Sequence, residues 1–260
     1  MWPLERKRDI LRIGRQCAEY WRWAPAEFAL QARLALNAEP GVAETLEAEL
    51  RSWLQSLDSE IARSKPVDVV LESAWLPAML VEAGRSTWNR DQVERLLRHR
   101  ITELYLQPGA PIDGWGLQLD HRPGDAQALG YALAPTTQQA VTGAMVAAGW
   151  RAASLQPALA WARQRLERRG RRLRTGWWVW CEQDRAIVSR IESGRITAMN
   201  TGAAVPSDED QCERLAAIEA ARWGVLGASD RAVMVSWEDL AAPPEDAAKP
   251  LPSRKLGVTT

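Results

Sequence analysis

The residues that could bind a metal ion are few in this chain of 260 residues, and they are widely separated. The two histidines, His99 and His121, form neither an HxH nor an HxxxH pair. The three cysteines, Cys17, Cys181 and Cys212, include no CxxC pair, and their number is odd. Structural zinc sites and disulfide frameworks need closely spaced ligands or paired cysteines. We therefore expect no metal site, no disulfide and a reducing compartment.

The sequence also gives little indication of a catalytic nucleophile or of a phosphate-binding loop. The sequence contains no GxxxxGK[ST], GxGxxG or GxSxG motif, and no further glycine extends the GxG of Gly114 and Gly116. Cys181 lies in the apolar segment WWVWCEQD, where a thiol is usually inert. Asp120 and His121 could act as an acid and a base, but no nucleophile stands near them in the sequence. We expect no catalytic residue, no nucleotide-binding residue and no cofactor.

Carboxylates on predicted strands offer the alternative chemistry. An enzyme of the ribonuclease-H type holds metal ions with several carboxylates that converge at strand ends. The candidates here are Asp68, Asp120 and Glu182, which could bind Mg²⁺ if the fold brought them together. A Mg²⁺-dependent enzyme that binds or hydrolyses nucleotides therefore remains the alternative hypothesis.

The arginine-rich segment RQRLERRGRRLR, residues 163–174, is the clearest candidate for a binding surface. Such a segment can bind phosphates, acidic lipids or an acidic protein, and it can equally be a solvated helix end. Two tryptophans that follow it favour a surface for a protein partner. We expect this surface to contain Arg163, Arg168, Arg169, Arg171, Arg172, Arg174, Trp177 and Trp178. A nucleic-acid module that uses the same segment is a third hypothesis, to be tested by salt-dependent binding.

The composition is that of an ordinary globular protein, with 46% hydrophobic and 25% charged residues. Because 33 basic residues balance 33 acidic ones, the chain has no overall attraction to nucleic acid, and we expect no nucleic-acid partner. The 14 tryptophans, against one Phe and three Tyr, favour tryptophan as core filler over a partner surface. No signal peptide and no apolar segment of membrane-spanning length are visible. We therefore expect a cytoplasmic protein that does not enter the membrane by itself.

The pattern of apolar residues predicts an α/β protein. We expect a hairpin at 10–14 and 17–23, helices at 25–36 and 42–62, and a second hairpin at 67–73 and 77–83. The remaining predicted elements are a helix at 90–105, paired strands at 115–120 and 128–134, a helix at 136–148, a strand at 151–157, a helix from 157, a three-stranded meander at 177–182, 186–192 and 195–201, a helix at 208–223 capped by Ser207, and a strand at 232–237.

These elements suggest a hinge near Gly170, and the family resemblance given in the next paragraph implies a lobe on each side of it. Residues 1–65 hold the N-terminal hairpin and helices and form part of the first lobe, which continues through 66–170. Residues 171–240 form a partial second lobe. The segment 241–260 is rich in Pro and Ala, and we expect it to be disordered.

Several segments resemble one family of bacterial proteins. They are VDVVLESAWLPAMLVEAG, RHRITELY, YALAPTTQQAVTGAMVAAGWRAASLQPALAWARQRL and GWWVWCEQDRAIVSRIESGRI. This pattern, over residues 66–237, looks like actin-like proteins related to PilM and GspL from pilus and type II secretion gene clusters. The resemblance implies an actin-like, ribonuclease-H-related α/β fold with mixed sheets, flanking helices and a truncated second lobe. It also implies a scaffold at the inner-membrane face of a pilus or secretion platform, with other assembly proteins as partners.

The sequence departs from the nucleotide-binding members of that family at two turns. Those members carry a DxG-type phosphate turn in the first hairpin, whereas residues 11–20, LRIGRQCAEY, contain Gly14 without a preceding acid. The corresponding turn of the second lobe, CEQDRA, contains Glu182 and Asp184 but no glycine. We therefore expect a non-catalytic scaffold, a pseudo-ATPase, in the assembly of a type IV pilus or type II secretion-like platform.

Overall fold

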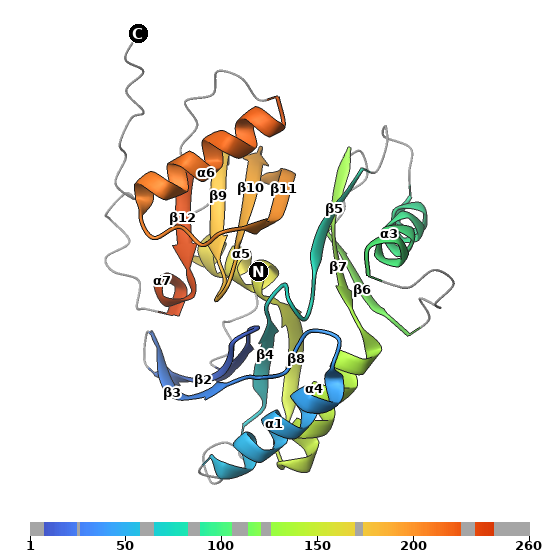
Figure 1. The fold of residues 1–260 in the computed structure, drawn as a ribbon, viewed down its shortest axis with the longest axis vertical. Helices are drawn as coiled ribbons and strands as arrows, with labels where there is room; N and C mark the ends of the chain where they lie inside the picture. Colours follow the sequence, from blue (N-terminus) through green and yellow to red (C-terminus); the bar gives the residue numbers. More distant parts are fainter. Residues whose placement is uncertain are drawn as a thin grey trace. The chain divides into compact units, whose positions relative to one another are not determined.

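The computed structural model divides the chain into two units, Met1–Ala158 and Leu159–Thr260, and each is described by itself (Figure 1). This division falls earlier in the chain than the expected hinge near Gly170. The residues that the structure describes are 8–24, 27–57, 65–82, 89–105, 114–120, 126–169, 174–224 and 232–241. Gly170, His121 and most of the expected disordered tail lie outside these ranges. Among the described residues, no helix is both long and apolar enough to span a membrane.

A five-stranded sheet forms the centre of the first unit, in the order β3-β2-β1-β4-β8. Its strands are β1 (Ile10–Ile13), β2 (Cys17–Ala24), β3 (Glu27–Ala35), β4 (Val67–Leu71) and β8 (Ala152–Pro157). The expected hairpin of β1 and β2 is confirmed, and β1 runs parallel to β4, which runs parallel to β8. The central strands ILRI and VDVVL are rich in branched apolar residues, as strands covered on both faces usually are.

The prediction of a helix over residues 25–36 is wrong, because this segment contains the edge strand β3, paired antiparallel with β2. Its Ala, Leu, Gln, Arg and Glu residues favour a helix, but pairing within the sheet overrides that weak local preference. Gln31 has no register partner on β2, which places a bulge in the strand. The side chain of Gln31 donates to the carbonyl of Ala29 at 3.1 Å.

A second sheet of the first unit has the order β5-β7-β6. It contains β5 (Ala78–Glu82), β6 (Gly116–Asp120) and β7 (Gln127–Leu133). The pairing of β6 with β7 is confirmed, but the predicted hairpin of residues 67–73 with 77–83 is wrong, since β5 pairs with β7 and β4 with β1 and β8. Helix α3 (Arg90–Tyr105) contributes Leu97 and Ile101 to a cluster with Met79, Val81 and Ala132.

Two helices pack against each other in the first unit, α1 (Ala43–Ser56) and α4 (Pro135–Ala147) (Figure 1). The apolar stripe of α1 buries Leu46, Leu50 and Leu54, as its spacing predicts. The indole of Trp150, two residues before β8, donates to the carbonyl of Leu54 at 3.2 Å. This hydrogen bond links the segment between α4 and β8 to the last turns of α1.

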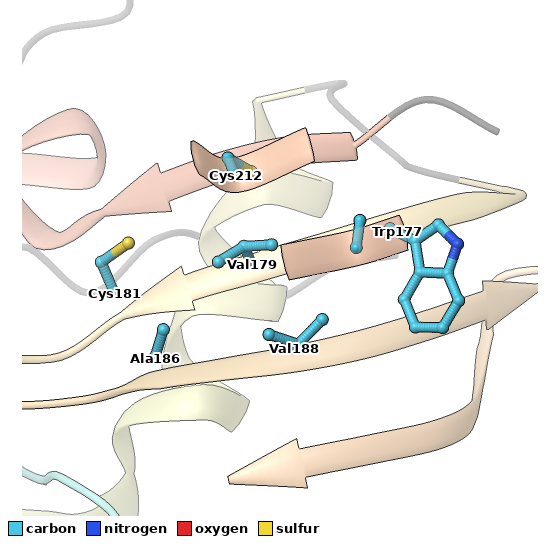
Figure 2. Close-up of a cluster of buried hydrophobic side chains, with 7 residues drawn as sticks. Trp177, Val179, Cys181, Ala186, Val188 and Cys212 are labelled. Atoms are coloured by element: carbon cyan, nitrogen blue, oxygen red, sulfur yellow. The ribbon is translucent and has the colours of Figure 1, made fainter. Parts of the chain in front are cut away.

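The second unit is built on a four-stranded sheet in the order β11-β10-β9-β12. The predicted meander is confirmed as β9 (Gly176–Cys181), β10 (Ala186–Glu192) and β11 (Arg195–Ala203), and β12 (Ala232–Ser236) runs parallel to β9. Helix α6 (Glu209–Arg222) places Cys212 and Ala216 in a buried cluster, whose other members are Trp177, Val179, Cys181, Ala186 and Val188 (Figure 2).

Two features of the second unit differ from the prediction. The N-cap of α6 is Asp208 rather than Ser207, because the carboxylate of Asp208 accepts the backbone N–H of Gln211 at 2.8 Å. The predicted strand at 232–237 ends one residue earlier, at Ser236, and a short helix that was not predicted, α7 (Trp237–Ala241), follows it. The ring of Trp237 stacks on that of Trp161 from α5 (Ala158–Arg168), with ring centroids 4.3 Å apart.

Candidate functional site

The turn between β1 and β2 is where a nucleotide-binding relative would hold phosphate. The backbone N–H of Gly14 donates to the carbonyl of Cys17 at 3.0 Å, which closes this turn. Because β4 runs parallel to β1, the residue after β4, Glu72, lies at the same edge of the sheet. Its backbone N–H donates to the carbonyl of Ile13 at 3.0 Å.

A buried arginine lies beside this turn. Arg12 on β1 donates from Nε to Oε1 of Glu72 at 2.8 Å, and from Nη1 to Oε2 of Glu19 on β2 at 2.9 Å. Its Nη2 also pairs with Glu72. The side chain of Arg12 is only 4% exposed, and those of both glutamates are 1% exposed. A cation and two carboxylates are therefore enclosed together in the interior of the first unit.

Further contacts complete the charge balance of Glu19. Arg33 on β3 pairs with its Oε1, and the indole of Trp21 donates to its Oε2 at 3.1 Å. The bond to Glu19 raises the pKa of Arg33 above its usual range. Arg12, Arg33, Glu19 and Glu72, the internal ion cluster, thus bring two guanidinium groups together with two carboxylates. Buried charges are tolerated when they are paired and hydrogen-bonded in this way.

The loop after β4 is tied to the β1–β2 turn by a tryptophan. The indole of Trp75, which is 3% exposed, donates to the carbonyl of Gly14 at 2.7 Å. The backbone N–H groups of Trp75 and Leu76 both bond to the carbonyl of Glu72. The N–H and the carbonyl of Gly14 are therefore both used inside the protein.

The corresponding turn of the second unit, between β9 and β10, is also closed by an arginine. The guanidinium of Arg185 holds the carboxylate of Asp184 in a two-pronged contact, with Nε–Oδ1 at 3.2 Å and Nη2–Oδ2 at 3.1 Å. The backbone N–H of Glu182 donates to the carbonyl of Arg185 at 2.9 Å. At this turn too, an acidic side chain has a cationic partner from its own chain.

The carboxylates of the alternative hypothesis lie on three different sheets. Asp68 lies within β4 and accepts from Ser154 at 2.7 Å and from Arg8 at 3.1 Å. Asp120 ends β6 in the second sheet, and Glu182 follows β9 in the second unit. Among the residues that the structure describes, no three His, Cys, Asp or Glu side chains are grouped to hold a metal ion. Beside the β1–β2 turn, the guanidinium of Arg12 lies between the carboxylates of Glu19 and Glu72.

Part of the arginine-rich segment has an internal role. Arg165, which is buried, donates from Nε to the carbonyl of Leu240 at 3.2 Å. Arg169 donates to the carbonyls of Asp239 and Leu240, both at 2.6 Å. These are carbonyls in the last turn of α7, which an α-helix leaves without partners of its own. Arg165 and Arg169 therefore fasten α5 to α7.

The rest of the expected partner surface divides into exposed, buried and undescribed residues. Arg168 and Arg174 are exposed and Arg163 is half-buried, whereas Arg171 and Arg172 lie outside the described ranges. Trp177 and Trp178 are 2% and 3% exposed, which corrects the expectation that they contribute to a surface. Both tryptophans follow the basic segment in the sequence because β9 begins there, and β9 is buried on both faces.

The remaining residues singled out in the sequence have ordinary environments. His99 is exposed on α3 and lies 3.1 Å from Glu103. No disulfide joins Cys17, Cys181 and Cys212. Burial raises the pKa of the Cys181 thiol to about 12, as the prediction of an inert thiol requires, and burial raises that of Cys212 to the same value.

The internal ion cluster itself was not predicted. The signal that could have revealed it is a single arginine in the apolar strand ILRI, with Glu72 directly after the apolar strand VDVVL. A charged residue within a strand that is otherwise buried needs a partner of opposite charge.

No protein-family model and no curated protein sequence matches the chain. Solved structures do match it over most of its length. The PilM–PilN type IV pilus biogenesis complex is 14% identical, with a TM-score of 0.56, and the match covers 90% of this chain and 82% of that one. A Bacteroides thetaiotaomicron protein of unknown function with an actin-like ATPase fold is 11% identical, with a TM-score of 0.53 and 91% and 84% covered.

A third similar structure is the cytoplasmic domain of EpsL, an inner-membrane component of the type II secretion system of Vibrio cholerae. It is 14% identical, with a TM-score of 0.50, and the match covers 88% of this chain and 81% of that one. At these identities the likeness concerns the fold, and it supports the resemblance to PilM-related proteins noted in the sequence. The chain therefore has an actin-like α/β fold.

Proposed function

We propose that this protein is a non-catalytic scaffold in the assembly of a type IV pilus or a type II secretion-like platform, at the cytoplasmic face of the inner membrane. The observation that carries the proposal is the internal ion cluster. The chain shares its actin-like fold with PilM and EpsL, and the cluster lies beside the turn at which nucleotide-binding members of the resembled family carry their phosphate motif. A scaffold of this kind keeps its shape without a bound nucleotide.

The internal ion cluster supports a fold that does not depend on a bound nucleotide. In an actin-like nucleotide-binding protein, charged ligands hold the phosphate turn in place. Here Arg12 joins β1 to Glu19 and Glu72, and Trp75 joins the following loop to Gly14. These contacts are all made within the chain, so they hold the turn without a ligand.

Partner proteins would bind the exposed part of the basic segment. Arg168 and Arg174 are exposed and flank residues 170–173, and Arg163 on α5 is half-buried. An acidic segment of another assembly protein has the complementary charge, and such rim charges mainly increase the association rate and the specificity. Arg165 and Arg169 are excluded from this role because they hold α7.

A deletion strain of the bacterium that carries the gene tests this function. Loss of surface pili or of secreted proteins, restored by the wild-type gene, is the expected result. A gene with both Arg168→Glu and Arg174→Glu should not restore assembly, although the protein accumulates normally. Arg214→Glu, at an exposed position on α6, is the matched control and should restore it. Normal pili and normal secretion in the deletion strain would refute the proposal.

The second candidate is a Mg²⁺-dependent nucleotide-binding or hydrolysing enzyme. The likeness to a protein with an actin-like ATPase fold favours it. Asp68, one of its candidate metal ligands, instead accepts hydrogen bonds from Ser154 and Arg8 of the same chain, which argues against it. Direct titration with nucleotide distinguishes the two candidates.

A further inference from the structure

Three polar atoms inside the second unit have no hydrogen-bond partner among the residues that the structure describes. They are Nε1 of Trp178, Nε1 of Trp180 and Oγ of Ser189. These residues are 3%, 0% and 0% exposed, so bulk solvent does not reach them. Buried polar groups in folded proteins nearly always have a partner, because a group without one loses its hydration and gains nothing that offsets the loss.

The three side chains share one face of the sheet. Trp178 and Trp180 are two positions apart on β9, and alternate residues of a strand point to the same face. Ser189 on β10 is the register partner of Trp178, and directly opposite residues of antiparallel strands have Cβ atoms about 5 Å apart on one face. The ring centroids of Trp178 and Trp180 are 6.4 Å apart. The two indoles and the hydroxyl therefore belong to one small region of that face.

The charged residue nearest to this region in β10 points the other way. Arg190 is the register partner of Trp177, and its guanidinium lies 5.6 Å from the centroid of that ring. Trp177 belongs to the buried cluster that includes Cys212 of α6, on the opposite face of the sheet (Figure 2).

The face that contains Ser189 is uncharged within β9 and β10. Its other members on β10 are Ile187 and Ile191, and on β9 they are Gly176 and the two indoles. A charged ligand at the hydroxyl would therefore meet no opposite charge from these two strands. Because burial of an unpaired ion is strongly unfavourable, the missing partner is a neutral polar molecule.

Water is the neutral molecule that fits these three groups. An indole N–H can only donate a hydrogen bond, whereas a hydroxyl can donate and accept. The oxygen of one water molecule can accept both indole N–H groups, and one of its hydrogens can be donated to Oγ of Ser189. Buried waters typically make about three hydrogen bonds to groups that the protein itself leaves without partners.

We propose that the second unit contains an internal water site formed by Nε1 of Trp178, Nε1 of Trp180 and Oγ of Ser189. Two of the 14 tryptophans then act as hydrogen-bond donors as well as core filler, a role that Phe could not take. The inference goes beyond the scaffold function, because it concerns the interior of the second unit and holds whichever partners the protein has.

A crystal structure of the full chain, at a resolution that shows ordered water, tests the site in the wild type. The expected result is the electron density of one water within about 3.2 Å of the hydroxyl oxygen and of both indole nitrogens. Any other result overturns the proposal, whether no density is present, a larger molecule lies there, or protein groups bond to the three atoms.

Ser189→Ala gives an independent test through the direction of its effect. If the hydroxyl is bonded to water, the substitution removes a hydrogen bond and leaves the water one partner short, so the melting temperature should fall by about 2–4 °C. If the hydroxyl has no partner, the substitution removes a buried group without a bond. An unchanged or higher melting temperature would therefore overturn the proposal.

Ser154→Ala is the matched control for this substitution. Ser154 also lies on a strand, and its hydroxyl donates to Asp68 at 2.7 Å, so the melting temperature of this variant should fall because a known hydrogen bond is lost. If Ser189→Ala does not fold, the density in the wild-type crystal decides alone.

Discussion

The Nε atom of Arg12 lies 2.8 Å from Oε1 of Glu72, a residue sixty positions later in the chain. This contact joins the central strand β1 to the end of its parallel neighbour β4 in a fully enclosed position. Removing one member of a buried ion pair leaves the other charge without a partner in a medium that solvates it poorly. The stability of the first unit should therefore depend strongly on this pair.

Substitution of Arg12 by Met should lower the free energy of unfolding by about 3–5 kcal/mol, since Glu19 and Glu72 then lose their shared cation. Urea denaturation measures this loss, and the slope m should stay unchanged. Arg51→Met is the matched control, because Arg51 pairs with Glu47 on the exposed face of α1, and its cost should not exceed about 0.5 kcal/mol. Equal costs for the two variants would contradict the role of Arg12.

Gly130 on β7 should not tolerate a larger residue, because α3 packs directly over it. A Cβ atom at this position would lie 2.5 Å from Cδ1 of Leu97, closer than packed carbon atoms approach. We expect Gly130→Ala to destabilise the protein by about 1–3 kcal/mol, whereas Gly116→Ala, whose nearest neighbour would be 3.6 Å away, should be close to neutral. Thermal unfolding of both variants checks the difference.

A double-mutant cycle assigns the cost at Gly130 to Leu97. Leu97→Ala alone leaves a cavity, but it also removes the atoms that the new Cβ would meet. Gly130→Ala should therefore cost much less in the Leu97→Ala background than in the wild type. Additive effects would show that the strain has another source.

Arg165 and Arg168 lie in the same basic segment but should behave differently. Arg165 is buried and shares the carbonyl of Leu240 with Arg169, so Arg165→Ala removes one of two donors to the end of α7 and should cost about 1–3 kcal/mol. Arg168 is exposed, and Arg168→Ala should cost no more than about 0.5 kcal/mol. Denaturant unfolding of the two variants distinguishes the buried arginine from the exposed one. A stable Arg165→Ala would show that α7 is held by other contacts.

The thiols of Cys181 and Cys212 should resist modification in the native protein. Burial raises the pKa of each from 9.0 to about 12, so almost no thiolate is present at neutral pH. A disulfide reagent at pH 8 should modify both only after denaturation, as mass spectrometry of peptides can show. Rapid modification of Cys181 in the folded protein would contradict the buried position of β9.

The same shifts predict how stability depends on alkaline pH. Because the folded state raises the pKa of both thiols, it keeps protons that the unfolded chain releases at lower pH. This contribution is complete below about pH 9 and is lost as the pH rises toward 12. Replacing Cys181 and Cys212 by Ala should make the fall in melting temperature between these values less steep.

Helices with a clear apolar stripe could be predicted from the sequence, and the edge strand could not. The spacing of Val93, Leu97 and Ile101 gives the bounds of α3, and that of Leu46, Leu50 and Leu54 places α1. Residues 27–35 consist largely of helix-forming residues, and only their pairing with β2 makes them a strand. The partner strand of β5 could not be predicted either. Either β4 or β7 could satisfy its hydrogen bonds, and the tertiary fold pairs it with β7.

The candidate site was partly visible in the sequence. The absence of an acid before Gly14 and of a glycine between Glu182 and Arg185 can be seen without a structure. The internal ion cluster cannot, because Arg12 meets Glu72 only through the parallel pairing of β1 with β4. The burial of Trp177 and Trp178 could not be predicted from the sequence either. Successive residues of a strand point to opposite faces, and here both faces of β9 are buried.

Isothermal titration of the full chain with Mg²⁺-ATP, combined with an assay for released phosphate, tests the central claim most directly. Since Arg12 holds the carboxylates and Trp75 holds the β1–β2 turn, we predict no saturable binding up to about 1 mM nucleotide and no phosphate release above the blank. Saturable binding of one nucleotide per chain with turnover that depends on Mg²⁺ would contradict the account and establish the enzyme instead.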